Sequence, residues 1–216
     1  MNTSIRRMLT LGAALTVATG LAACSSGSDG KSDATPTAAQ TTVAAKVSVE
    51  MGNLVGPGCP AYAAKVPAGK GSVKGMSNDP VVTAASHNPM LKTLTRALSG
   101  KLNSKVNLVD TLNGNEYTVF APVDTAFAEV PAQRLTKLRN DSTALVQLLT
   151  YHLVAGELTP AKVVGEQVTV EGKSVKVTGS GNTLKVNGAN IVCGGIKTAN
   201  ATVYLIDKVL DPADAK

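Results

Sequence analysis

The chain has 216 residues, a formal net charge of +6, no tryptophan and two phenylalanines. No block of five or six basic residues occurs, whereas nucleic-acid binding depends on such clusters, often together with stacking aromatic side chains. Composition and charge therefore argue against nucleic acid as a partner.

The N-terminal segment has the organisation of a secretory signal. Arg6 and Arg7 precede an apolar run from Met8 to Leu21, and the segment closes on Leu21-Ala22-Ala23-Cys24. A signal peptide typically has a charged start, an apolar run and small residues at its end. The apolar run here is shorter than the roughly 20 residues of a membrane span. The small residues before Cys24 resemble a bacterial lipobox, in which the cysteine sulfur receives a diacylglyceryl group. An ordinary signal peptide cut near Ala23 is the alternative.

We therefore expect residues 1–23 to be a lipoprotein signal peptide and Cys24 to carry lipid. Two acyl chains suffice for stable anchoring, and no later apolar run approaches membrane-spanning length. The lipid would then be the only membrane attachment. The protein is predicted to be exported and anchored to the outer face of the bacterial cell membrane, with extracellular release as a further fate.

Two segments of unusual composition follow. Residues 24–46, after the cysteine, are mostly Ser, Gly, Ala, Thr and Pro, which cannot bury enough surface to offset the entropy of ordering, so a disordered tether is expected. Residues 47–75 are punctuated by glycine and proline, and we expect an irregular extension that is held in place through Cys59. A compact domain is predicted over residues 76–212, followed by a short tail, 213–216.

The first half of this domain has helical signals. Asp79-Pro80 and Asn88-Pro89 each read as an N-cap followed by proline, and Gly100 ends the second helix. A third helix is predicted from Pro131. Leucines at helical spacing predict a fourth helix from about Asp141 to Val154.

In the second half of the domain, the spacing of apolar residues changes from helical to strand-like. Apolar residues alternate or run together at Val168–Val170, Val175–Val177, Leu184–Val186 and Ile191–Val192, separated by glycine-containing turns. This pattern predicts short antiparallel strands joined by hairpins, with a longer final strand from Thr202 to Leu210 and an isolated strand at Tyr117–Pro122. Helices gathered first and strands second indicate an α+β domain.

Cys59 and Cys193 remain once Cys24 is assigned to lipid. In an exported, oxidising context this pair predicts a disulfide. A metal site is the alternative and would need His87 and His152, but no two of these four residues have metal-ligand spacing. We therefore expect no metal and no cofactor.

Three segments occur in the order found in the fasciclin domain: TVFAPVDTAF (118–127), TYHLVAG (150–156) and ATVYLIDKVLDP (201–212). The chain resembles that family, and within it the mycobacterial secreted and surface-lipoprotein antigens, through LVGPGCPAYAA (54–64), VNLVDTLN (106–113) and IVCGGIKTANATVY (191–204). The resemblance implies a single domain built as an antiparallel β-sandwich or wedge with packed helices. It also implies pairing of Cys59 with Cys193.

Asp124, Tyr151 and His152 are the candidate site residues. Asp124 follows a strand and can cap the helix that carries Phe127. His152 shares a helical face with Leu145, Leu148 and Leu149, which favours a buried, hydrogen-bonded imidazole. The Tyr-His region of fasciclin domains has been discussed in adhesion, so direct contact with a partner is the alternative.

The sequence does not indicate an enzyme. Only two histidines are available as bases, and no nucleophile-elbow, phosphate-loop or zinc-protease motif occurs. The resemblance favours a non-catalytic adhesion or interaction module whose partner is a protein or polysaccharide of the cell surface or extracellular matrix, or another copy of itself. The alternative is a carrier of an apolar small molecule or lipid, which an apolar pocket of several hundred Å³ would favour.

Overall fold

The computed structural model describes residues 53–214, so the signal peptide, Cys24 and the tether lie outside the described residues. The helices are α2 (Cys59–Lys65), α3 (Val73–Met76), α4 (Val81–His87), α5 (Lys92–Leu98), α6 (Val109–Asn113), α7 (Asp124–Ala128), α8 (Ala132–Asn140) and α9 (Ser142–Tyr151), with short 3₁₀ turns η1 (Gly181–Thr183) and η2 (Pro212–Asp214). The strands are β1 (Tyr117–Pro122), β2 (Leu153–Ala155), β3 (Gly165–Val168), β4 (Ser174–Thr178), β5 (Lys185–Val186), β6 (Ala189–Lys197) and β7 (Ala201–Ile206). The α+β class is confirmed.

All seven strands belong to one sheet in the order β2-β1-β7-β6-β5-β4-β3. The pairing is antiparallel as expected except between β1 and β7, which are parallel from Tyr117↔Ala201 to Pro122↔Ile206. A parallel pair needs a long crossover connection, and here three helices and five strands intervene between the two partners. Hairpin signals between neighbouring segments therefore could not reveal this pairing.

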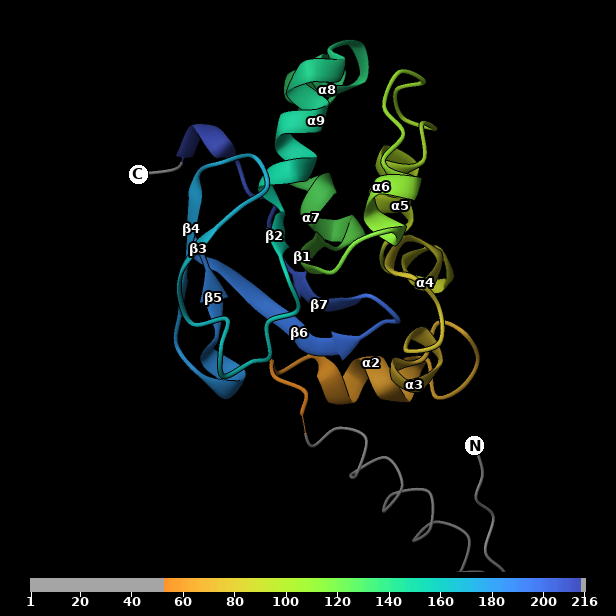
Figure 1. Ribbon diagram of the computed structural model, residues 1–216, viewed down its shortest axis with the longest axis vertical. Coiled ribbons are helices and arrows are strands. Elements are labelled where there is room, and N and C mark those ends of the chain that lie inside the picture. Colours follow the sequence, from red (N-terminus) through yellow and green to blue (C-terminus); the bar gives the residue numbers. More distant parts are fainter. Residues whose placement is uncertain (1–52, 215–216) are drawn as a thin grey trace, which may run out of the picture. The chain divides into compact units, whose positions relative to one another are not determined.

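The sheet curls until its two ends meet. Val154 of β2 bridges to Thr169, just beyond β3, and the Val170 N–H donates to the Leu153 carbonyl at 2.8 Å. Figure 1 shows β3, β4 and β5 on the side away from helices α4, α5 and α6, with α8 and α9 above. This curling produces the wedge that the sequence resemblance implied.

Two hydrophobic clusters hold the wedge together. One cluster contains Phe120, Tyr151, Val177, Tyr204 and Ile206, and the other contains Leu94, Leu98, Phe127, Leu145, Leu149 and Val203. Adjacent residues of one strand, such as Val203 and Tyr204, fall into different clusters because successive side chains point to opposite faces of a sheet.

Two predicted elements end earlier than expected. The helix predicted to reach Val154 ends at Tyr151, because the His152 carbonyl accepts from the Phe120 N–H at 2.9 Å and Leu153 pairs with Val119. The final strand ends at Ile206 instead of Leu210. Beyond Ile206 the chain leaves the sheet, and the Leu210 N–H donates to His152.

The extension before Gly75 was expected to be irregular, but it contains helices α2 and α3. Cys59 is the first residue of α2 and is disulfide-bonded to Cys193 of β6, with 4.7 Å between their Cα atoms. Pro60 fits the first turn of α2, where no N–H is needed. Val55 and Gly194 exchange backbone hydrogen bonds of 3.0 and 2.7 Å, so the extension is attached to β6 by backbone pairing as well as by the disulfide.

Helix α4 is capped differently from the prediction. Pro80 occupies the N-cap position and Asp79 makes no capping bond. The N–H groups of Val81 and Val82 donate instead to the side-chain oxygens of Asn200 and Asn113, at 2.9 and 3.2 Å. Both asparagines are distant in sequence, so local spacing could not identify them.

Within residues 53–214, no helix is long and apolar enough to cross a membrane. In the same described range, no three His, Cys, Asp or Glu side chains are grouped so that they could hold a metal ion.

Candidate functional site

Asp124 caps a neighbouring helix and not its own. It is the first residue of α7, and its carboxylate accepts from the backbone N–H groups of Thr93 at 2.7 Å and Lys92 at 3.4 Å. These groups open α5, whose own N-cap residue, Leu91, has no side-chain acceptor. Asp124 therefore ties α7 to α5, which corrects the prediction that it caps the helix carrying Phe127.

Replacing Asp124 by alanine is expected to lower the free energy of unfolding by about 1 kcal/mol, because the first turn of α5 loses its acceptor. Asp124→Asn keeps an oxygen at the cap and should cost less. Urea unfolding of the two variants beside the parent protein measures both values. Equal stability of the alanine variant and the parent protein would show that the cap contributes nothing.

Tyr151 and His152 are buried at the junction of α9 and β2. The Tyr151 hydroxyl donates to the Ser174 carbonyl at 3.2 Å and accepts from Asn187 Nδ2 at 2.9 Å. His152 Nδ1 lies 2.7 Å from the Leu148 carbonyl, and its Nε2 accepts from the Leu210 N–H at 2.9 Å. These partners require a neutral imidazole protonated on Nδ1.

The environment of His152 favours this neutral state. Burial lowers its pKa from 6.5 to about 4, against smaller opposing contributions from the Leu148 carbonyl and Asp211. The side chain is 3% exposed, so a partner that docks on the surface does not reach the ring. Any role of His152 in binding must pass through the residues that it holds.

A groove rimmed by both positive and negative side chains lies next to the chain segments that His152 holds. It consists of two adjoining hollows of about 220 and 430 Å³ that share Arg134, Leu138, Leu148 and Asp211. We call it the charged groove; its charged rim residues are Glu129, Arg134, Lys137, Glu171, Lys173, Lys208, Asp211 and Asp214. Arg134 of α8 forms an ion pair with Asp211 of the C-terminal segment.

His152 holds two parts of this groove in position. It accepts the Leu210 N–H, and the next residue, Asp211, lies on the rim. It also bonds to the carbonyl of Leu148, whose side chain lines the groove. His152 of the predicted Tyr-His motif thus supports the groove from within the core. No local sequence signal could identify the rim residues, because α8, the β3–β4 turn and the C-terminal segment meet only in the folded protein.

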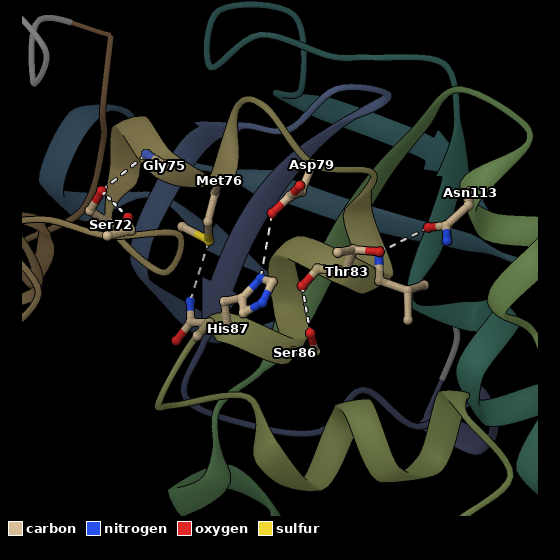
Figure 2. Close-up of polar contacts among 11 residues, drawn as sticks. Ser72, Gly75, Met76, Asp79, Thr83, Ser86, His87 and Asn113 are labelled. Atoms are coloured by element: carbon tan, nitrogen blue, oxygen red, sulfur yellow. Dashed lines mark hydrogen bonds and ion pairs between the residues drawn. The ribbon is translucent and has the colours of Figure 1, made fainter.

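The other histidine lies on α4. His87 Nδ1 lies 3.5 Å from Asp79 Oδ2, and the neighbouring Ser86 hydroxyl donates to the Thr83 carbonyl at 2.7 Å (Figure 2). Within residues 53–214 no hydrogen bond joins Ser86 to His87, although nucleophilic catalysis by serine depends on a bond to its base. Figure 2 also shows the Ser72 hydroxyl accepting from the Gly75 N–H, 3.0 Å away, at the start of α3. These contacts stabilise the helix ends of this region.

Comparison with known proteins gives one consistent result. Residues 89–212 match the model of the family described as the fasciclin domain. The chain is 56% identical to the immunogenic protein MPB70 of Mycobacterium bovis over 174 residues, which are 81% of this chain and 90% of that protein. It is 50% identical to the cell surface glycolipoprotein MPB83 of the same species over 196 residues, 89% of each chain.

Among solved structures, the chain is similar to a FAS1 domain pair from the insect cell adhesion molecule Fasciclin I. The TM-score is 0.54 at 19% sequence identity, and the match covers 66% of this chain. It covers 54% of that chain, so the present chain spans about half of the two-domain protein. At this identity the similarity concerns the fold alone.

Proposed function

Because the chain belongs to the fasciclin domain family, we propose that it is a non-catalytic interaction module displayed on the outside of the cell. Its relatives include a cell surface glycolipoprotein, to which it is similar over 89% of its length. The two histidines also argue against catalysis, since His152 is buried within the core and His87, on α4, faces a single carboxylate, that of Asp79.

The charged groove is the observation that supports this function. Its lining combines lysines and an arginine with glutamates and aspartates, and also includes the apolar side chains of Leu138 and Leu148. A rim that carries both signs selects partners by complementary charge and orients them. We infer that the groove contacts a protein or polysaccharide of the cell surface or extracellular matrix, or a second copy of this chain.

Reversing the charge of two lysines on the rim of the groove should weaken adhesion. Beads coated densely with the Lys137→Glu/Lys173→Glu variant are expected to be retained on envelope or matrix surfaces about tenfold less than beads with the parent protein, equivalent to about 1.4 kcal/mol. Lys185→Glu is the control, because Lys185 is exposed on β5 and does not line the groove. Dense coating is needed since many weak contacts raise avidity by about 10²–10⁴.

If beads with the double variant are retained as well as beads with the parent protein, the groove is not the contact surface. Retention of the parent equal to that of blank beads on a broad panel of surfaces would contradict adhesion itself.

Lipid on Cys24 is the proposed means of display. Cys24→Ala should move the protein from the membrane fraction to the medium, or leave its signal uncleaved, because no sulfur remains to be acylated. Fractionation with intact-mass measurement checks this expectation. Membrane association with a mass changed only by the substitution would contradict lipidation.

One observation supports the second candidate function, a carrier of apolar molecules. A hollow of about 290 Å³, lined mainly by apolar side chains, lies among α5, α7, α8 and α9. Its volume approaches the lower limit of small-molecule sites, about 300 Å³.

A further inference from the structure

The hollow among the four helices combines an apolar lining with two arginines. We call it the helix pocket; its apolar lining includes Leu102, Phe127, Leu135, Leu145 and Leu149. In Figure 1, α7 lies between α5 on one side and α8–α9 on the other. Most small-molecule sites are apolar hollows with a few placed polar groups, and the helix pocket has this composition.

The charges of the helix pocket do not balance. Asp124 lines it, but its carboxylate accepts from the backbone N–H groups that open α5. Arg96 of α5 and Arg139 of α8 also line it, and both are exposed. Within residues 53–214 neither guanidinium has a hydrogen-bond or ion-pair partner, unlike Arg134, which is paired with Asp211. Two guanidinium groups are therefore available for a ligand beside an apolar lining.

The charged groove and the void beside α4 lack this combination. The charged groove has carboxylates on its rim beside its basic residues, so its charges are balanced internally. A void between α4, α5 and the sheet, next to Met76 and Leu112, is wholly apolar but holds only about 20 Å³. The helix pocket combines a volume near that of small-molecule sites with an apolar lining and unpaired positive charge.

We propose that the helix pocket binds a single-chain anionic amphiphile. The hydrocarbon chain lies against the leucines and Phe127, where burial removes its methylene groups from water. The carboxylate or phosphate head accepts hydrogen bonds from Arg96 and Arg139, because a guanidinium is weakly hydrated and matches these anions with two parallel N–H donors. Such a ligand requires both features of the pocket together.

Binding can be measured by calorimetry on the full chain carrying Cys24→Ala, which avoids both detergent and competing acyl groups. Decanoate is the probe. Decyltrimethylammonium has the same chain with a cationic head, and acetate has the anion without a chain. We expect one decanoate per protein, with affinity at least tenfold above that for either control compound. Decyl phosphate should behave as decanoate does.

Two variants and a control locate the site. Arg96→Gln/Arg139→Gln should weaken decanoate binding at least tenfold, while Lys65→Gln/Lys185→Gln, which removes two charges on α2 and β5, should leave it unchanged. Ala128→Phe introduces a ring at the exposed wall of the pocket and should abolish binding. Circular dichroism verifies that each variant is folded.

Equal binding of decanoate and decyltrimethylammonium would overturn the proposal, because the arginines would then contribute no selectivity. Decanoate binding that survives Ala128→Phe in a folded protein, or no decanoate binding at all, would overturn it too. None of these outcomes bears on adhesion through the charged groove, which the Lys137→Glu/Lys173→Glu variant tests separately.

Discussion

Removing the Cys59–Cys193 disulfide is expected to lower the free energy of unfolding by about 5 kcal/mol. The bond closes a loop whose ends are 134 residues apart in the sequence, and a loop of this length strongly restricts the unfolded chain. A typical domain is stable by only about 5–15 kcal/mol, so the loss would be a large share of the total. Both cysteines are buried, and the bond anchors α2 to β6.

Guanidinium unfolding of the Cys59→Ala/Cys193→Ala variant measures this effect. The parent protein in reductant provides an independent comparison and should unfold at nearly the same denaturant concentration as the variant. If reductant and the double substitution both leave the midpoint unchanged, the disulfide is either absent from the exported protein or without effect on stability.

Acidification from pH 7 to pH 4 is expected to cost about 3 kcal/mol through His152 alone. Burial lowers the pKa of this histidine to about 4, against 6.5 in the unfolded chain. Between these values the unfolded state binds the proton and the folded state does not. The contribution is therefore complete above pH 6.5 and is lost as the pH falls towards 4.

The His152→Gln variant has no imidazole at this position and should lack that part of the pH dependence. This variant should be less stable than the parent at pH 7, since the Leu148 and Leu210 backbone groups lose a well-placed partner. The difference in the free energy of unfolding between the two proteins should narrow by about 3 kcal/mol at pH 4. Urea unfolding at several pH values gives the difference curve, in which the carboxylates common to both proteins cancel. His87→Gln, at the other histidine, should retain the acid loss. If the curves of unfolding free energy against pH run parallel for the parent and His152→Gln, the imidazole of His152 is not buried in its neutral form.

Sequence periodicity was sufficient to predict most elements of the fold. Val175 and Val177 alternate with exposed residues in β4, and Pro131 marks the start of α8. Local patterns did not reveal where an element ends through a tertiary contact, as α9 does when Phe120 bonds to the His152 carbonyl. Local patterns also did not reveal helix α2, because glycine and proline surround it and the residue that anchors it, Cys193, is distant in the sequence.

The sequence predicted the support of the candidate site but not its surface. His152 could be assigned to the core because Leu148 and Leu149 share its face. Arg134 and Asp211, in contrast, are ordinary surface residues in the sequence, and only the fold brings them together. Asp124 shows the same limit, because its position suggested a cap but could not reveal which helix it caps.

The place of β7 also governs the order in which the domain can be assembled. It is the last strand along the described chain, yet it lies between β1 and β6. Until it emerges, β1 and β6 lack the strand that lies between them, and the apolar faces of the β1–β2 pair and of the β3–β6 meander remain open to water. Pairing across such long sequence separations slows folding, which suits the proposed export of the chain across a membrane before it folds. The same delay leaves unpaired edges exposed during synthesis, so a nascent chain held before Ala201 would depend on chaperones to stay soluble.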